Sequence, residues 1–393
     1  MPTPNSGSAA APSWLERCGQ TELVIVLFGA TGYTGRRTAE AMVRRGLQPV
    51  LAGRSAGRLT SLAQRLAKLG FGKPDVVTAD VGDAASVRAL IGRGDVLVST
   101  VGPFIRLGDP ALSAVVDAGA IYLDSTGEAP FIRRVFEEFG PPAQRSGASL
   151  ITAFGHDYVP GNLAGALALR RSGGGVHRVE IGYLISAGGR SQVISRGTLS
   201  SIVGLFTEQS FTWRAGIQAE PIGSRMRTFL LDGRDCPALT IGSTEHFSLP
   251  RLAGPQGLPE VDVYLGWFGP AVRALHLSSR VTPALLVLPG ARSVVRRIGG
   301  FAARWSAEEP DPAALARVTS HIVGTAYDAS GTTLAQVHLV SGDPYQLTAN
   351  LLAWGAQRAA EQGVSGPGAL GPVEAFGLDE LEAGALQAGL RRQ

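Results

Sequence analysis

The amino-acid sequence predicts an α/β protein with a Rossmann-type doubly wound parallel sheet and an α+β second domain. Three observations lead to this prediction. An apolar run, a glycine-rich turn and an amphipathic segment follow one another within and after Leu23–Gly35. Strand, helix and polar loop then alternate regularly as far as Thr152. Past Ala153 this rhythm gives way to alternating strands with turn signals, which are typical of antiparallel pairing.

The glycines after the first strand predict a dinucleotide site. Gly29 lets the chain turn off the strand, Gly32 leaves room for a pyrophosphate, and Gly35 lets the helix pack closely on the sheet. The free N–H groups and the dipole of that helix then face the anion. The spacing is GxxGxxG rather than GxGxxG, and a fold that keeps the turn but binds nothing is the alternative. The residues between the glycines that we count as cofactor contacts are Thr31, Tyr33 and Thr34.

Composition excludes several classes of protein. A chain of 393 residues with 45% hydrophobic and 17% charged residues is long and apolar enough for two folded domains. The net charge of +4 is spread out, and Lys68 and Lys73 are the only lysines. Since no basic block is interleaved with aromatic residues, we expect no nucleic-acid partner. Cys18 and Cys236 form no metal-binding or disulfide pattern, so we expect no metal.

The ends of the chain and its longest apolar run predict a cytoplasmic protein. Met1–Ser13 lacks a basic segment followed by an apolar core, so we expect a flexible tail rather than a signal peptide. Val281–Leu288 is too short to span a bilayer. We divide the chain into a tail (1–20), a nucleotide-binding domain (21–155), an inserted α+β substrate and dimerisation domain (156–343) and C-terminal elements (344–393) expected to return to the first domain.

The alternation of apolar and polar residues predicts the individual elements. In the first domain we expect helices at Tyr33–Arg45, Ala56–Leu69, Ala84–Ile91 and Pro110–Ala118, and further strands at Pro49–Ala52, Asp75–Ala79, Asp95–Thr100, Ala120–Leu123 and Ser149–Thr152. Beyond it we expect a helix ending near Arg171, helices at Arg196–Trp213 and Tyr345–Gln362, strands at Val176–Ile185, Arg317–Ala326 and Thr332–Leu339, and a strand-and-helix pair in Pro367–Gln393. The turn Asp328–Gly331 predicts a hairpin.

The turn after the second strand favours NADP(H) over NAD(H). An NAD site normally places a carboxylate there for the ribose, whereas this chain has Arg54 and Ser55, which suit a 2′-phosphate. The alternative for Arg54 is an ordinary solvated charge. Asp80, after the third strand, is either near the adenine or the cap of the helix at Ala84–Ile91. The loop after the fourth strand is expected near the nicotinamide ribose and phosphates, and it contains Val101, Gly102, Pro103 and Phe104.

Catalytic candidates cluster where two further loops leave the sheet. Among residues on or after strand five, we expect Tyr122, Thr126 and Glu128 to bind substrate; Asp124 lies beside them. After strand six, His156 or Tyr158 is the candidate proton donor to a developing enolate, with Asp157 orienting it. Each residue alone also has a structural alternative, such as a buried tyrosine, or an aspartate that caps the helix at Asn162.

Two common chemistries are absent from the sequence. No tyrosine has a lysine four residues later, so the Tyr/Lys pair of short-chain dehydrogenases is missing. No nucleophile elbow supports Ser/His/Asp hydrolysis. The stretch Val261–Trp305 combines apolar residues with several arginines. It is interpreted either as a membrane-surface or lipid-groove segment or as an ordinary helical interface or core helix.

Five motifs resemble those of the saccharopine dehydrogenase-like oxidoreductases, and within that group the bacterial trans-acting enoyl reductases of lipid and polyketide assembly. In chain order they are FGATGYTG, LAGRS, STVGPF, YLDSTGE and GHDYVPGNLAG. The match is specific over Leu23–Leu169 and weaker in Tyr345–Leu390. Where family members have GFDxVP, this chain has GHDYVP, so His156 is a departure.

The resemblance implies a Rossmann domain completed by C-terminal elements, an inserted α+β domain, and NADPH as cofactor. It carries over as cofactor contacts Gly29, Gly32, Gly35, Arg54, Ser55 and Val101–Phe104. It supplies no agreed catalytic residue.

The function that we expect is NADPH-dependent reduction of an activated C=C bond in an acyl or polyketide-derived substrate of secondary or lipid metabolism. We expect a hydrophobic substrate and leave open whether a carrier protein delivers it. We also expect a homodimer and no contact with a membrane. One rival is a saccharopine-type C–N (imine) dehydrogenase, for which Arg190 and Arg196 are candidate carboxylate ligands. The other rivals are a non-catalytic NADP(H)-binding regulator and a membrane-surface protein.

Overall fold

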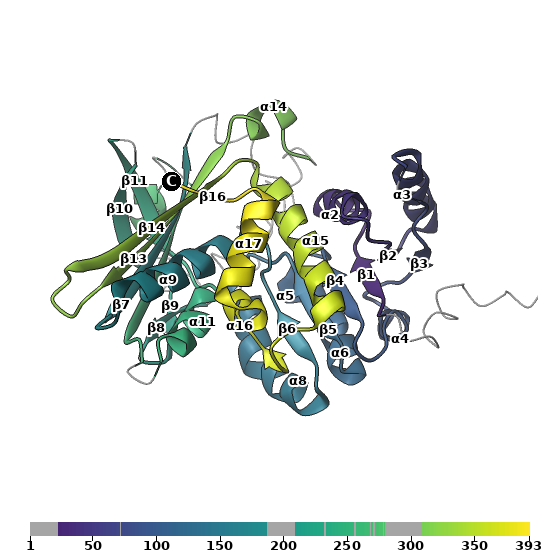
Figure 1. The fold of residues 1–393 in the computed structure, drawn as a ribbon, viewed down its shortest axis with the longest axis horizontal. Helices are drawn as coiled ribbons and strands as arrows, with labels where there is room; N and C mark the ends of the chain where they lie inside the picture. Colours follow the sequence, from purple (N-terminus) through teal and green to yellow (C-terminus); the bar gives the residue numbers. More distant parts are fainter. Residues whose placement is uncertain are drawn as a thin grey trace, which may run out of the picture.

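In the computed structural model, the chain forms two sheets with helices packed around them (Figure 1). The described residues are 23–70, 72–186, 209–231, 233–254, 257–267, 269, 272–277, 279 and 309–393. The predicted tail at 1–20, Arg190, Arg196 and most of the arginine-rich apolar stretch lie outside them. The first residues of that stretch form the buried strand β12 (Glu260–Gly266).

The first sheet is parallel and has the order β15-β6-β5-β4-β1-β2-β3. Its strands β1 to β6 follow the doubly wound order, with the reversal between β1 and β4, so the predicted Rossmann-type fold is confirmed. The central strands are almost continuous apolar runs because helices cover both faces. The strands are β1 Ile25–Phe28, β2 Val50–Gly53, β3 Val76–Thr78, β4 Val96–Ser99, β5 Ile121–Asp124, β6 Ser149–Ile151 and β15 Gly368–Ala369.

The helices of this part include all four that the periodicity predicts, together with several that it does not. The predicted ones are α2 Tyr33–Arg44, α3 Ala56–Lys68, α4 Ala84–Arg88 and α6 Asp109–Ala118. The additional ones are α5 Phe104–Leu107, α7 Ala129–Arg134, a π-helical turn η1 Val135–Phe139 and α8 Gly140–Ser146. Prolines early in α7 and α8 resemble loop signals in the sequence, but a first-turn proline lacks only an N–H that would have no helical partner.

The second sheet is mixed and contains nine strands. Its main path is β10-β11-β12-β7-β13-β14-β16, and the β8–β9 hairpin joins it at β12. The predicted hairpin is confirmed, because β13 and β14 pair antiparallel. Helix α9 (Val159–Ser172) packs on β7, β13 and β14, and α11 (Glu245–Leu252) packs on α9. The strands not yet given are β7 Arg178–Ser186, β8 Ser210–Arg214, β9 Ile217–Glu220, β10 Met226–Leu231, β11 Arg234–Thr240, β13 Thr319–Tyr327, β14 Thr333–Ser341 and β16 Arg391–Arg392.

The predicted helix ending at Trp213 is wrong in its last residues. Trp213 lies on β8, which pairs with β9 and β12, and its indole Nε1 donates to the Leu258 carbonyl at 2.7 Å. Pairing partners distant in sequence decide the structure of this segment, and local periodicity does not reveal them. Residues 196–208 of the predicted helix lie outside the described part of the chain.

The C-terminal elements connect the two sheets (Figure 1). Helix α15 (Pro344–Gln362) packs on α2, β4 and β5, and β15 extends the first sheet beside β6. Helices α16 (Pro372–Phe376) and α17 (Leu378–Ala388) contact α9, and β16 pairs with β14 of the second sheet. The return to the first sheet is therefore observed, and the last strand goes further, to the second. The exact domain boundaries stay a prediction.

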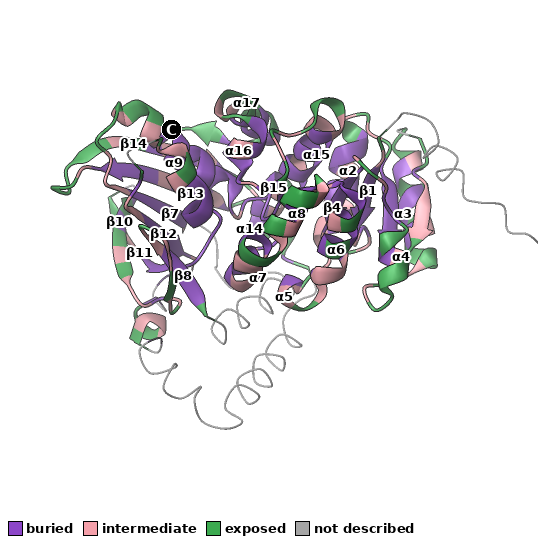
Figure 2. Cartoon of the chain, turned by 90° about the horizontal axis from the view of Figure 1, so that it is seen from below, coloured by how far each residue is buried: buried purple, intermediate pink, exposed green. Residues whose placement is uncertain are grey.

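Buried side chains fill the space between these layers. Figure 2 shows the central strands of the first sheet and α9 largely buried, while α3, α8, α17 and β14 expose one side. A short helix, α14 (Pro312–Leu315), precedes β13. No helix in the described ranges is long and apolar enough to cross a membrane.

Candidate functional site

The glycine turn after β1 is closely packed against the turn after β4. Gly29 has a φ of +85°, and a Cβ there would lie 2.8 Å from Thr100 Oγ1 and from Val101 Cγ2. A Cβ on Gly35 would lie 2.3 Å from the carbonyl oxygen of Gly29. Both positions therefore require glycine, one for its backbone conformation and its neighbours and the other for the close approach of α2.

The N-terminus of α2 can hold an anion. Its N-cap is Gly32, which has no side chain to bond the first N–H groups, and the first turn carries no acidic residue. Tyr33, Thr34 and Gly35 are the first helical residues, so their N–H groups have no partner within the helix. These groups and the helix dipole favour a phosphate, and the glycines leave space for one. The residues present thus fit a dinucleotide pyrophosphate.

The turn after β2 places a cation and a hydroxyl beside a second helix N-terminus. Arg54 is exposed and makes no hydrogen bond or ion pair with the described residues. Ser55 is the N-cap of α3, but its side chain makes no capping hydrogen bond. The predicted contacts of Arg54 and Ser55 with cofactor remain predictions, and both groups are available for one.

Asp80 does not cap the following helix, so that alternative is wrong. Asp83 is the N-cap of α4, and its carboxylate accepts from the N–H groups of Ala85 and Ser86. The Asp80 carboxylate instead accepts from the Gly82 N–H at 2.8 Å. Asp80 is exposed after β3, and its proximity to an adenine stays a prediction.

Glu128 holds the loop that follows β4. Its two carboxylate oxygens accept from the N–H groups of Phe104 and Ile105, each at 2.9 Å, and the side chain is buried. Thr100 Oγ1 lies 3.2 and 3.1 Å from the carbonyl oxygens of Phe28 and Gly29. The loop of residues 101–104 is thereby fixed against the glycine turn from one side and by the β5 loop from the other.

The other predicted substrate ligands on this loop are also buried. Tyr122 and Thr126 are enclosed, and Thr126 Oγ1 accepts from the Glu128 N–H. Asp124 accepts from Thr126, Ala153 and Thr152, and burial raises its pKa to about 6. Burial, together with the nearby Asp124 carboxylate, raises the pKa of Tyr122 well above its usual value. Substrate contact by Tyr122, Thr126 or Glu128 stays a prediction, while their observed contacts order the loop.

His156 lies at the junction between the two sheets. Its ring is 2% exposed, and both nitrogens have protein partners: Nδ1 is 3.1 Å from Asp157 Oδ1, and Nε2 is 2.6 Å from Ser320 Oγ. Its backbone N–H donates to Thr348 Oγ1 on α15. The sequence reasoning missed Ser320, because it lies 164 residues away on β13.

Asp157 and Tyr158 bring this segment against the β5 loop. A Cβ on Gly127 would lie 3.2 Å from Asp157 Oδ2, and the Tyr158 hydroxyl donates to the Gly127 carbonyl at 3.2 Å. The two loops predicted to face one another therefore meet. Asp157 is 31% exposed, whereas burial raises the pKa of Tyr158 well above 10. The alternative that Asp157 caps the helix is wrong, since α9 starts at Val159 and Asp157 pairs with His156.

Another buried carboxyl group, that of Glu245, lies behind these residues. Tyr183 accepts from the Gly161 N–H at 2.9 Å and donates to Glu245 Oε1 at 2.7 Å. The Tyr183 ring lies edge-on to Tyr158, with the ring centres 5.6 Å apart. Burial raises the pKa of Glu245 to about 7. The sequence contains no signal for this pair, because a glutamate at the start of a helix is ordinarily an exposed first-turn acid.

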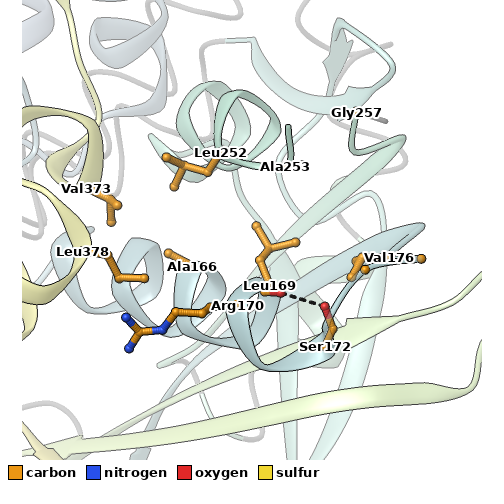
Figure 3. A pocket seen from close by; sticks show the side chains of 12 residues that line it. Ala166, Leu169, Arg170, Ser172, Val176, Leu252, Ala253, Gly257, Val373 and Leu378 are labelled. Carbon is orange, nitrogen blue, oxygen red and sulfur yellow. Dashed lines mark hydrogen bonds between the residues drawn. The ribbon is translucent and has the colours of Figure 1, made fainter. Parts of the chain in front are cut away.

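Two surface hollows lie mostly outside the predicted site. One, of about 430 Å³, is bordered by the end of α9 and by α11, α16 and α17; Leu169, Leu252, Val373 and Leu378 point into it (Figure 3). The other, of about 400 Å³, lies between α2, α3 and the segment before α14, and contains Tyr33 and Arg36. Except for Tyr33, no predicted site residue lines either one. Within the described ranges, no cluster of three metal-ligating side chains occurs.

Similarity to curated proteins covers part of the chain. It is 36% identical over 146 residues to a trans-acting enoyl reductase of Mycobacterium ulcerans, and 36% identical over 155 residues to one of Mycobacterium tuberculosis. The chain resembles the trans-acting enoyl reductases. The alignments cover 37% and 39% of this chain but only 35% and 37% of the relatives, so the chain matches little more than a third of their length. Over a segment of this length, the resemblance that the motifs predict is confirmed. No protein-family model matches the chain.

The fold extends the similarity to the whole chain. The homospermidine synthase of Legionella pneumophila, solved in complex with NAD, aligns with a TM-score of 0.57 over 95% of this chain and 92% of that chain. The identity is 9%, so this similarity concerns the fold alone. It agrees with the predicted combination of a Rossmann-type domain and a second sheet.

Proposed function

We propose that the chain is an NADPH-dependent reductase of an activated C=C bond in a hydrophobic acyl or polyketide-derived substrate. The observation that carries the proposal is the glycine cradle at the carboxyl edge of the first sheet, directly beside the junction of the two sheets. The similarity to proteins named trans-acting enoyl reductase supports the reaction type. The residues of the cradle fit a dinucleotide, as the packing around Gly29 and Gly35 indicates.

The choice of NADPH rests on the turn after β2. Arg54 is exposed and unpaired within the described structure, and Ser55 has a free hydroxyl at the N-terminus of α3. A guanidinium, a hydroxyl and helix N–H groups together suit a dianionic 2′-phosphate. No carboxylate stands in this turn to bind the two hydroxyls of an unphosphorylated ribose.

The residues of the chain have to orient the substrate and provide a proton. When bound, reduced nicotinamide supplies the hydride. The loop of residues 101–104, which Glu128 holds, follows β4 at the carboxyl edge of the sheet, and this position supports a contact with the nicotinamide end of the dinucleotide. The substrate then occupies the junction, between this loop and the segment that carries His156 and Asp157.

The proton source that we favour is the Asp157–His156 pair. Asp157 is partly exposed and linked to the buried His156 ring, so a proton can pass from the pair to the carbanion or enolate that forms after hydride transfer. Tyr158 is the weaker candidate, since burial raises its pKa well above 10 and its hydroxyl already donates to Gly127. Of the two residues of the pair, Asp157 is therefore the one that can face the substrate.

The substrate, its delivery and the assembly are part of the same proposal. We propose that the chain works as a homodimer, without a nucleic-acid partner, on an acyl thioester that a carrier protein can deliver. For the imine-reducing rival, the described residues offer no specific observation in favour.

The test is a direct comparison of cofactors and substrates with the full chain. NADPH and NADH binding are measured by calorimetry, and NADPH oxidation is followed with enoyl thioesters, free enones and imines. We expect NADPH to bind more tightly than NADH and to be oxidised by an enoyl thioester. Oxidation with imines alone would replace the proposal by its C–N rival, and binding without oxidation by any substrate would favour the regulator.

A further inference from the structure

Ser320 completes a line of three side chains across the domain junction. The Asp157 carboxylate lies 3.1 Å from His156 Nδ1, and the opposite nitrogen, Nε2, lies 2.6 Å from Ser320 Oγ. Asp157 and His156 follow the first sheet, whereas Ser320 lies within β13 of the second. The ring is therefore held between groups from both sheets.

The order Asp, His, Ser matches a hydrolytic triad, but the burial of the serine argues for another role. Ser320 is 0% exposed and lies inside a strand that pairs on both sides. The His156 ring covers its Oγ, so an acyl group cannot reach this oxygen unless the elements packed on that face of the sheet move apart. The hydroxyl acts on the histidine ring rather than on a substrate.

A serine hydroxyl can serve the ring in both of its charge states. A neutral ring beside an ionised Asp157 carries its proton on Nδ1, so Nε2 accepts from Ser320. A protonated ring donates from Nε2, and the hydroxyl of Ser320 must then turn its own proton to another acceptor. The serine thus keeps Nε2 hydrogen-bonded while the ring gains or loses a proton.

Ser341 is the candidate for that acceptor, after a change of side-chain rotamer, because the two hydroxyls are not hydrogen-bonded in this structure. It lies directly opposite Ser320 in the register of β13 and β14, on the same face of the sheet. Its Oγ is buried and has no hydrogen-bond partner among the described residues. An unpaired buried hydroxyl costs free energy. Accepting from Ser320 beside a protonated His156 would give Ser341 a partner once one of the two serine side chains changes rotamer.

We propose that Ser320 is a positioning residue for His156, and that it keeps Nδ1 directed at Asp157 whether the ring is neutral or charged. Its place in catalysis rests on the proposed function. In that reaction one carbon of the C=C bond gains hydride from NADPH, which leaves as NADP⁺. The other carbon gains the proton of the Asp157–His156 pair, which is replaced from water.

The other groups that face the ring do not compete for this role. Tyr183 and Trp267 lie 6.0 and 5.5 Å away between ring centres, and Tyr158 neighbours Tyr183. Burial raises the pKa of both tyrosines well above 10, so they stay neutral. Glu245, behind Tyr183, has a pKa raised to about 7 by burial, so Glu245→Gln serves as a control for its charge.

The first test is the tautomer of His156, which needs no substrate. Full-length protein with ¹⁵N-labelled histidine is compared by NMR, and His156→Asn identifies the signal among those of the six histidines. We expect the neutral ring to carry its proton on Nδ1 in the wild type, in Glu245→Gln and in Ser320→Thr. In Ser320→Ala, Nε2 loses the partner that holds the ring toward Asp157, so we expect both tautomers. An unchanged tautomer in Ser320→Ala would overturn the proposal.

The second test is steady-state kinetics. With an enoyl thioester, Ser320→Ala should lower kcat about tenfold or more and leave the KM for NADPH unchanged, and Ser320→Thr should restore most of the rate. Ser149→Ala is the matched control, because this buried serine bonds the Gly366 carbonyl away from the junction. An equal loss in both alanine variants would reduce Ser320 to a stability role. If the tautomer shifts but no enoyl substrate is reduced, the proposed function fails and the positioning role stands.

Discussion

Replacing Glu128 by glutamine tests how the cofactor-facing loop is held. The wild-type carboxylate accepts from two backbone N–H groups at 2.9 Å, from Phe104 and Ile105. The amide of glutamine keeps one acceptor oxygen and turns an NH₂ group toward the other N–H. One buried N–H then loses its partner, at about 1–3 kcal/mol, and the remaining bond changes from charged to neutral, at about 1 kcal/mol. The local cost is about 2–4 kcal/mol.

Amide hydrogen exchange measures this cost at the site itself. Where exchange follows local opening, 2–4 kcal/mol corresponds to exchange of Phe104 and Ile105 that is faster by about thirtyfold to a thousandfold. The matched control is Glu137→Gln, since Glu137 is 41% exposed and pairs with Arg133, one turn away. An exposed ion pair of this kind contributes about 0.3–0.5 kcal/mol to stability, so exchange of the Phe104 and Ile105 amides should change little in Glu137→Gln. Unchanged protection of Phe104 and Ile105 in Glu128→Gln would refute the reasoning.

Three further predictions concern the cradle, the cofactor choice and the buried carboxyl group. Gly35→Ala places a methyl group 2.3 Å from the Gly29 carbonyl, so NADPH binding should be lost while circular dichroism stays native-like; a wild-type Kd would contradict the close approach. Arg54→Ala should raise the NADPH Kd about 10–100-fold and leave the NADH Kd within about twofold, with Arg65→Ala on the following helix, α3, as control; parallel losses for both cofactors would remove the 2′-phosphate assignment. Burial raises the Glu245 pKa from 4.5 to about 7, so the folded state binds this proton more tightly than the unfolded state. Wild-type stability should therefore fall by about 3 kcal/mol relative to Glu245→Gln as the pH rises from 4.5 through 7; a difference independent of pH in denaturant unfolding would contradict the burial of an ionising group.

The nucleotide-binding half was predictable because its signals are local. Parallel strands buried on both faces give apolar runs such as that of β1, and the glycine spacing follows directly. The helices α2, α3 and α6 follow from periodicity. The run from α7 to α8 does not, since its prolines resemble loop residues until their first-turn positions are known.

The second sheet depends on pairings that are distant in sequence. Phe211 and Trp213 belong to a strand because β9 and β12 lie beside it, and the sequence of that segment alone favoured a helix. The mixed order around β12 and β7, which pair parallel, could not be obtained from local patterns either.

The candidate site divides in the same way. The proximity of His156 and Asp157 could be predicted, since they are adjacent in sequence and follow a strand of the first sheet. The contact of His156 with Ser320 and that of Tyr183 with Glu245 join residues 164 and 62 positions apart. The sequence around Glu128 does not show that its carboxylate holds backbone N–H groups of another loop.

The central claim is that this chain transfers hydride from NADPH to an activated C=C bond. The most direct measurement is single-turnover reduction of an enoyl thioester with NADPH deuterated at the transferable position. We predict that one deuterium appears at the β-carbon of the saturated product, that the α-carbon takes its hydrogen from water, and that NADH supports the reaction poorly. A product without deuterium, or oxidation of NADPH only when an imine is present, would contradict the claim.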